Sequence, residues 1–170
     1  TAVQMGPESA SAFVLCYVLR LEGDLSPDSL SSALTQVVQR HAALRTLVAR
    51  DGSGQMILPS VPVSVPVVDL QALAEGERVH ALEEIVQHEV RTPIELGDAP
   101  LWRACLVRES SARHRFVFSI HHLICDGWSS AVLFSDLAAA YRADRFGLPP
   151  EWPPALPYAE CLQALLDEPA

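Results

Sequence analysis

The chain contains no lysine, and all twelve of its basic residues are arginine. This absence excludes Schiff-base chemistry and a P-loop, since both depend on a lysine amine. Positive charge is scarce as well, because 12 basic residues stand against 21 acidic ones and the net charge is −9 at pH 7. Nucleic acids and anionic membranes need clustered positive charge, so neither is an expected partner.

Long apolar runs and regular cysteine spacing are also absent. No run approaches the roughly 20 apolar residues that a membrane helix needs, and the opening residues, TAVQMGPESA, lack the basic and apolar parts of a secretory signal. The cysteines form no CxxC pair, so a disulfide framework is not expected; they are Cys16, Cys105, Cys125 and Cys161. These features predict a cytoplasmic protein with reduced thiols.

The apolar content is sufficient for a folded core. Hydrophobic residues make up 49% and charged residues 19% of 170 residues, which excludes a disordered chain and indicates one domain or one lobe of a larger domain. Periodicity and turn residues predict strands over 13–22, 44–50, 55–58, 101–108 and 114–121, and helices over 26–41, 69–91, 128–145 and 158–167.

The order of these elements favours an α/β or α+β fold in which helices cover a sheet. The last two strands suit an antiparallel pair, because a short polar link joins them. The segment 61–68 is expected at a sheet edge, since Pro62 and Pro66 cannot donate to a ladder.

The clearest chemistry lies in residues 119–129, SIHHLICDGWS. His121 and His122 end a predicted strand, and a rigid strand end can direct an imidazole into a cleft. With a pKa near ~6.5, neutral imidazole can accept a proton at physiological pH. Gly127 would permit a turn that other residues avoid, and the following helix would direct its N–H groups back towards the loop.

Each part of this string also has an ordinary structural interpretation. A pair of adjacent histidines is more often a polar feature of a strand end than a catalytic site. A shared metal ion is disfavoured, because neighbours on a strand point to opposite faces and no second thiol or HxxxH spacing completes a ligand set. The Asp126–Gly127 pair could equally form a simple turn, so only the complete string favours a functional loop.

The complete string HHLICDGWS resembles the HHxxxDG signature of nonribosomal peptide synthetase condensation domains and of the wider chloramphenicol acetyltransferase-like acyltransferases. Upstream, RHAALRT at 40–46 resembles the second motif of the same family, RHxxLRT, and LEGDL at 21–25 is its usual lead-in. The segment 158–160, Tyr-Ala-Glu, is loosely similar to the next motif. The motifs occur in the order of the family, and the resemblance covers nearly the whole chain.

The resemblance implies a lobe of the chloramphenicol acetyltransferase type. Such a lobe is a two-layer α/β (α+β) sandwich with a mixed, largely antiparallel sheet covered by helices. Residues 1–170 would form the N-terminal lobe of a condensation domain, and the C-terminal lobe, which helps to enclose the active site, would be absent from this chain. The first motif of the family is not recognisable near residue 1.

The resemblance also implies roles for the loop. His122 would be the base or the positioning group for the attacking amine, and His121 would be mostly structural. Gly127, without a side chain, would leave the substrate tunnel open. Asp126 would point away from the substrate and form a structural salt bridge with an arginine, since a buried carboxylate needs a compensating cation. Arg45 is the expected partner, with Arg40 as second choice.

Other polar and aromatic residues receive structural interpretations. Four histidines are expected at the surface or beside helices, namely His41, His80, His88 and His114. Three tryptophans are expected to pack, namely Trp102, Trp128 and Trp152. The thiol of Cys125, inside the loop, is expected to be a small buried packing group.

An intact condensation domain joins a carrier-bound acyl or peptidyl thioester to a carrier-bound aminoacyl group through an amide bond. Phosphopantetheine arms would arrive on donor and acceptor carrier proteins, so no intrinsic cofactor or metal is implied. Further partners would be the missing lobe and the neighbouring synthetase domains, and the isolated chain is expected to be inactive. Two alternatives stay open: a non-catalytic docking or recruitment lobe or inactive fragment, and a CoA-dependent acetyltransferase that completes its site by oligomerisation.

Overall fold

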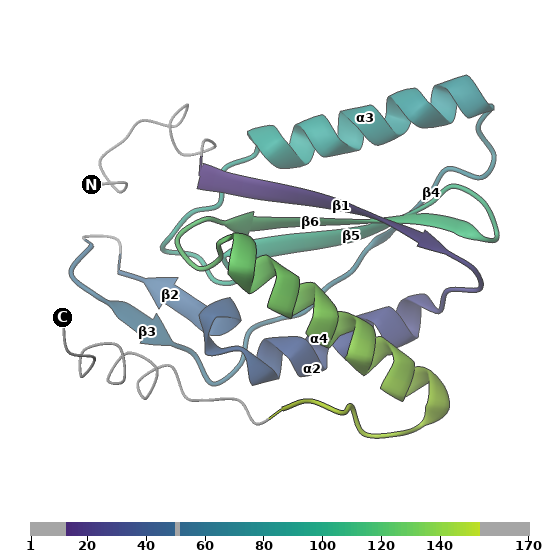
Figure 1. The fold of residues 1–170 in the computed structure, drawn as a ribbon. Helices are drawn as coiled ribbons and strands as arrows, with labels where there is room; N and C mark the ends of the chain where they lie inside the picture. Colours follow the sequence, from purple (N-terminus) through teal and green to yellow (C-terminus); the bar gives the residue numbers. More distant parts are fainter. Residues whose placement is uncertain (1–12, 50–51, 154–170) are drawn as a thin grey trace.

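The computed structural model describes residues 13–49 and 52–153, and its centre is a four-stranded sheet (Figure 1). The strands lie in the order β1 (Val14–Glu22), β6 (Arg113–His121), β5 (Trp102–Arg108) and β4 (Val67–Asp69). The first three are antiparallel, and β4 joins the edge parallel to β5. The expected mixed, largely antiparallel sheet is therefore confirmed.

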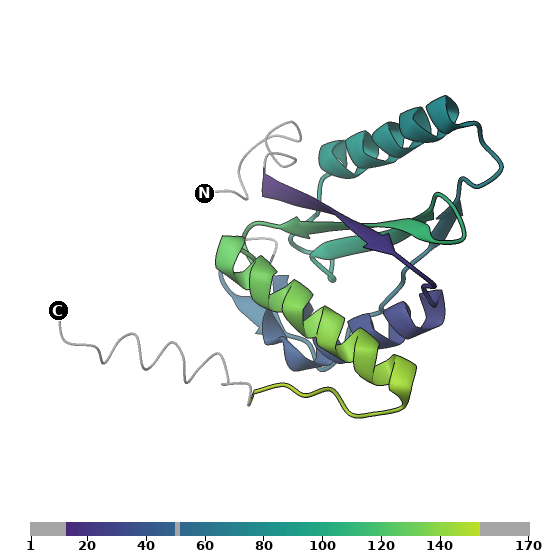
Figure 2. The same ribbon diagram turned by 45° about the vertical axis from the view of Figure 1, so that its right-hand side comes forward.

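Helices cover both faces of this sheet. On one face lie α2 (Pro27–Arg40) and α4 (Gly127–Phe146), which pack against each other, and on the other lies α3 (Glu75–Arg91) (Figures 1 and 2). The described part of the chain thus has three layers where the prediction had two. The difference arises because β5 and β6 carry apolar side chains on both faces of the sheet. Each face is therefore buried against a helix.

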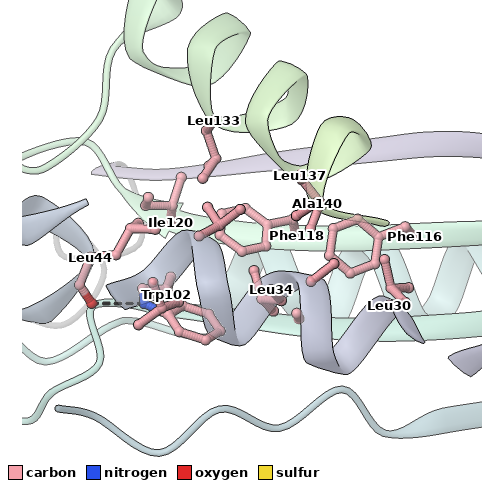
Figure 3. Packing of buried hydrophobic residues seen from close by; sticks show 14 of the residues in the cluster. Leu30, Leu34, Leu44, Trp102, Phe116, Phe118, Ile120, Leu133, Leu137 and Ala140 are labelled. Atoms are coloured by element: carbon pink, nitrogen blue, oxygen red, sulfur yellow. Dashed lines mark hydrogen bonds between the residues drawn. The ribbon is translucent and has the colours of Figure 1, made fainter. Parts of the chain in front are cut away.

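Alternation along β6 divides the core as predicted. Phe116, Phe118 and Ile120 are fully buried against α2 and α4 (Figure 3), whereas Val117 faces Leu82 and Ile85 of α3. His114 lies on the same face of β6 as Phe116 and is also buried, which corrects its expected place at the surface or beside a helix.

Local signals set the helix ends. Ser26 caps α2 by accepting a hydrogen bond from the Ser29 amide at 3.1 Å, and Pro27 is its first residue, as predicted. Helix α4 ends at Gly147, whose φ of 65° lies in the left-handed region. Helix α3 begins later than predicted, because residues 67–69 are used by β4.

The expected strand over 44–50 is only partly present. Residues Ala42–Arg45 form a short 3-10 helix, η3, and the strand β2 is limited to Thr46–Val48, paired antiparallel with β3 (Gln55–Ile57). The predicted helix over 158–167 lies outside the described residues. Within the described ranges, no helix is both long and apolar enough to cross a bilayer.

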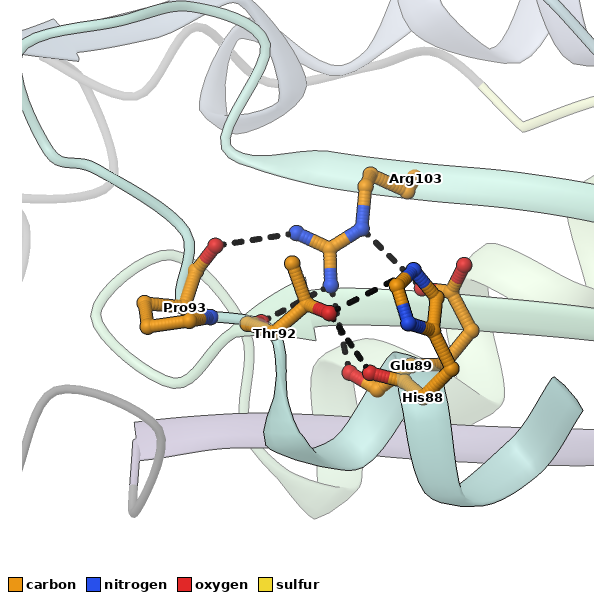
Figure 4. Close-up of polar contacts among 5 residues, drawn as sticks. All are labelled: His88, Glu89, Thr92, Pro93 and Arg103. Carbon is orange, nitrogen blue, oxygen red and sulfur yellow. Dashed lines mark hydrogen bonds and ion pairs between the residues drawn. The ribbon is translucent and has the colours of Figure 1, made fainter. Parts of the chain in front are cut away.

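A single arginine fixes the end of α3 against the sheet (Figure 4). Arg103 on β5 donates to the carbonyl oxygens of Glu89, Thr92 and Pro93 at 2.9–3.1 Å, and its Nε is 3.0 Å from the Glu89 carboxylate. The last carbonyls of a helix lack partners within the helix, and a guanidinium supplies several donors at once. This contact anchors α3 to β5, which is the neighbour of the strand β6 that leads into the histidine loop.

Candidate functional site

The two sequence motifs meet across one cleft. Its volume is about 340 Å³, and one wall is formed by Ala42, Ala43 and Thr46 together with β3. The other wall is the loop 122–126, which begins with His122, and the start of α4. Strand β6 ends beside η3, so residues that are far apart in the sequence become the two sides of a single site.

His122 is the first residue after β6, and its side chain is exposed on the cleft. Its backbone N–H donates to the carbonyl oxygen of Phe13 at 2.7 Å, which holds the strand end against the start of β1. The main chain at His122 is therefore fixed while its imidazole remains open to a ligand. This is the placement that a base or positioning group needs.

His121, its neighbour, points the other way and is buried. Its Nδ1 accepts a hydrogen bond from the Leu123 amide at 3.1 Å, and its ring stacks on Phe13 with centroids 6.1 Å apart. An accepting Nδ1 places the single proton of the neutral ring on Nε2. Burial lowers the pKa of His121, and the adjacent charge of His122 lowers it further. His121 thus shapes the loop as a neutral ring.

Acid is expected to weaken the fold through this ring. Because the folded pKa of His121 lies below its unfolded value of about 6.5, the unfolded chain binds more protons, and the free energy of unfolding falls as pH drops through about 6.5. Burial lowers the pKa of His114 in the same way. Asparagine can replace the accepting Nδ1 without titrating. Denaturant unfolding between about pH 7.5 and about pH 5 should therefore show a shallower slope for His121→Asn, and identical slopes would contradict the assignment.

Asp126 caps helix α4. Its Oδ1 accepts hydrogen bonds from the amide and the hydroxyl of Ser129, at 2.8 and 2.7 Å. These bonds to Ser129 lower the pKa of the Asp126 carboxyl. Gly127, the next residue, is the first of α4 and does not have a left-handed φ, so the expected special turn is wrong. A Cβ at Gly127 would meet no atom within 4 Å, so open space lies beside it in this lobe.

The predicted salt bridge between Arg45 and Asp126 is not formed, although both residues are described. Arg45 donates instead to the backbone carbonyls of Val38 at 3.1 Å, of Gln39 at 3.3 Å and of Leu58. Because η3 follows α2 directly, its arginine reaches back to the unpaired carbonyls at the end of α2. The Asp126 carboxylate is exposed to solvent and accepts hydrogen bonds from Ser129, so it requires no cation.

The second choice, Arg40, pairs with a different carboxylate. Its Nε donates to Oδ2 of Asp136 on α4 at 2.8 Å, and Nε2 of His41 lies 2.8 Å from the same oxygen. The sequence reasoning missed Asp136. It placed His41 at the surface or beside a helix, and His41 does lie beside a helix, as the C-cap of α2. A signal was available, because Asp136 interrupts the otherwise apolar helix face formed by Leu133 and Ala140.

Cys125 is buried in the loop, as expected. Burial raises the pKa of its thiol to about 11, with a smaller contribution from Asp126, so at neutral pH it is the weakly nucleophilic thiol. Within residues 13–49 and 52–153, no three His, Cys, Asp or Glu residues are grouped as a metal ion would require.

Comparison with known proteins supports the family that the motifs resemble. The family model of the condensation domain matches residues 2–167. Chondramide synthase cmdD of Chondromyces crocatus is 34% identical over 152 residues, which are 88% of this chain and 4% of that protein. The chain therefore spans only a small part of the curated relative.

Two solved structures are similar over nearly the whole chain. The SgcC5 protein from Streptomyces globisporus is 32% identical with a TM-score of 0.79, over 97% of this chain and 38% of that one. A structure of the X-domain and OxyB from teicoplanin biosynthesis is 33% identical with a TM-score of 0.74, over 91% and 34%.

The sheet, its helices and the histidine loop define a lobe of the chloramphenicol acetyltransferase-like fold. The chain belongs to the condensation domain family, and its relatives include proteins named as nonribosomal peptide synthetases.

Proposed function

We propose that residues 1–170 form the N-terminal lobe of a condensation domain that makes amide bonds. The observation that carries the proposal is the exposed imidazole of His122 on a cleft walled by both motifs. The intact domain would use a carrier-bound acyl or peptidyl thioester as donor and a carrier-bound aminoacyl group as acceptor. The chain covers 38% of the length of a similar solved structure, which leaves room for a second lobe across the cleft.

The proposed reaction needs orientation more than strong activation. The acceptor amine attacks the thioester carbonyl, a C–N bond forms, and the C–S bond breaks. The amine loses one proton and the departing thiolate gains one, so the lengthened chain ends on the acceptor carrier. His122 holds the amine or accepts its proton, and a fixed strand end suits either role because it limits the motion of the ring.

The partners in this proposal are two carrier proteins with phosphopantetheine arms, the C-terminal lobe and the neighbouring synthetase domains, all in the cytoplasm. No cofactor bound by this chain itself takes part. The arms would deliver their thioester and amine to the cleft beside His122 from opposite sides.

Intact-protein mass spectrometry tests this function. The intact domain is incubated with a donor carrier loaded with a panel of acyl or peptidyl groups and an acceptor carrier loaded with aminoacyl groups. We expect an acceptor carrier whose mass has increased by the donor acyl group, only when all three proteins are present. Absence of condensed product across the panel, with both carriers fully loaded, would contradict the proposal.

A second candidate is a recruitment lobe without turnover. It is favoured by the 33% identity to the solved complex of the X-domain and OxyB from teicoplanin biosynthesis. In that case the lobe would bind a carrier or tailoring protein with an affinity that does not change when His122 is replaced. Such binding, combined with no condensation in the mass spectrometry assay, would support this candidate over the first.

A further inference from the structure

A second hollow, of about 330 Å³, lies directly beside the cleft. Both are bordered by Ala43, Ile124, Cys125 and Ser129, so a ligand group could extend from one into the other. Leu44, Ile120 and Leu133, which are labelled in Figure 3, form its buried floor. Its volume is at the lower end of the range for ligand sites, about 300–1,000 Å³.

The lining of this hollow is apolar and carries no carboxylate or guanidinium. Val132 and Trp128 form its outer rim, and the Trp128 side chain is 86% exposed. An exposed indole on an apolar rim offers contact area to a bound group. A charged side chain would lose its hydration here and find no counterion, so the hollow favours an apolar group.

Besides the thiol of Cys125, three side chains of the lining can form hydrogen bonds: His41, Ser129 and Trp128. The indole N–H of Trp128 can only donate. The hydroxyl of Ser129 already donates to Oδ1 of Asp126 at 2.7 Å. The thiol of Cys125 is a weak donor and points to the Asp126 carbonyl. His41 is thus the side chain of the lining that can offer a ligand N–H a free acceptor.

The orientation of His41 is fixed from several sides. Its backbone N–H donates to Val37 and its carbonyl accepts from Leu44, at 2.9 and 3.0 Å. Its Nε2 is 2.8 Å from the carboxylate of Asp136, whose charge is already balanced by Arg40. A carboxylate only accepts, so Nε2 is the donor in this pair, and the acceptor of an imidazole that is protonated at Nε2 alone is Nδ1. Among the described residues, Nδ1 has no hydrogen-bond partner.

We propose that this hollow is a substrate subsite for an apolar aminoacyl group, and that His41 is its recognition residue. The aliphatic or aromatic side chain of the group fills the hollow, and an N–H of the same group donates to Nδ1 of His41. Asp136 acts as a positioning residue, because it fixes the tautomer and the orientation of the imidazole. The inference rests on the proposed function, and it adds the class of aminoacyl group that the site accepts.

Binding to the intact domain tests the subsite without turnover. The probes are leucyl-pantetheine and aspartyl-pantetheine in amide-linked, non-hydrolysable form, which differ only in the side chain. We expect leucyl-pantetheine to bind at least about tenfold more tightly in calorimetry, because a leucine side chain gains from burial and a carboxylate is penalised. Its addition should also shift the imidazole ¹⁵N signals of His41. Equal affinities, or no binding of the leucyl probe at millimolar concentration, would overturn the proposal.

A substitution separates recognition from structure. Glutamine at position 41 can still donate its amide to Asp136, but it lacks the acceptor at Nδ1. His41→Gln should therefore raise the Kd of leucyl-pantetheine about tenfold, since a ligand N–H is left unpaired, with little change in the free energy of unfolding. The exposed His80 provides the matched control, and His80→Gln should change neither quantity. An unchanged Kd for His41→Gln would overturn the proposal.

The two proposals fail in different ways. If the leucyl probe binds with the expected dependence on His41 but no condensed product forms, the amide-forming function is rejected and the subsite stands. If condensation proceeds while leucyl and aspartyl groups are bound alike, only the subsite is rejected.

Discussion

Replacement of His122 by alanine is expected to lower the rate of amide formation by about 10²- to 10⁴-fold, the usual contribution of a positioned acid–base group. The imidazole is exposed on the cleft, and its backbone N–H bond to Phe13 is independent of the side chain. The loss should therefore fall on the chemical step and not on folding. The measurement is the single-turnover rate of the intact domain with both carriers loaded, followed by mass spectrometry.

Two comparisons make this result specific. His80→Ala removes an exposed histidine on α3, far from the cleft lining, and should leave the rate unchanged. Thermal unfolding of His122→Ala should match that of the original protein, because no buried group is removed. An unchanged rate of condensation for His122→Ala would show that His122 takes no part in the mechanism.

Replacement of Asp136 by alanine is expected to cost about 3 kcal/mol of the free energy of unfolding, the lower end of the range for breaking a buried ion pair. The side chains of Arg40 and Asp136 are 14% and 10% exposed. Without the carboxylate, Arg40 keeps a partly buried charge, although it still donates to the Pro153 carbonyl at 2.6 Å and lies over the Trp152 ring. His41 loses the partner of its Nε2 at the same time.

Denaturant unfolding of three variants tests this expectation. Asp24 is the control, because it pairs with Arg145, which lies on α4 as Asp136 does. The side chain of Asp24 is 92% exposed, so Asp24→Ala should cost less than about 1 kcal/mol. Asp136→Asn keeps the shape and an accepting oxygen and should fall between the two. If Asp136→Ala is no more destabilising than Asp24→Ala, the buried network does not hold the helices together as described.

Much of the fold was predictable from local patterns. The strands β1, β5 and β6, the start of α2 and the extent of α4 follow from alternation, capping residues and glycine, each of which acts over a few residues. The division of β6 into two buried faces was also visible, since side chains alternate along any strand. The third layer was not, because an apolar strand does not show which helix will cover its second face.

The site shows where local reasoning ends. The loop with His122 at a strand end was predicted as a unit, and the structure places it on a cleft. The partner of Asp126 was wrong, because an aspartate just before a helix can serve its own helix, and Ser129 was near enough to satisfy it. Similarly, η3 turns Arg45 back to the end of α2, a contact that depends on where the chain goes after the helix.

The sequence by itself determined most of the elements, the family and the histidine loop that we propose to carry the chemistry, since these depend on residue types at short spacing. The tertiary structure alone decided which charges meet and what surrounds the cleft. Arg40, His41 and Asp136 lie on segments that the sequence separates, and only the packing of α4 against α2 brings them to one carboxylate oxygen. Charge pairing acts over a few ångströms of space, and distance along the chain does not report it.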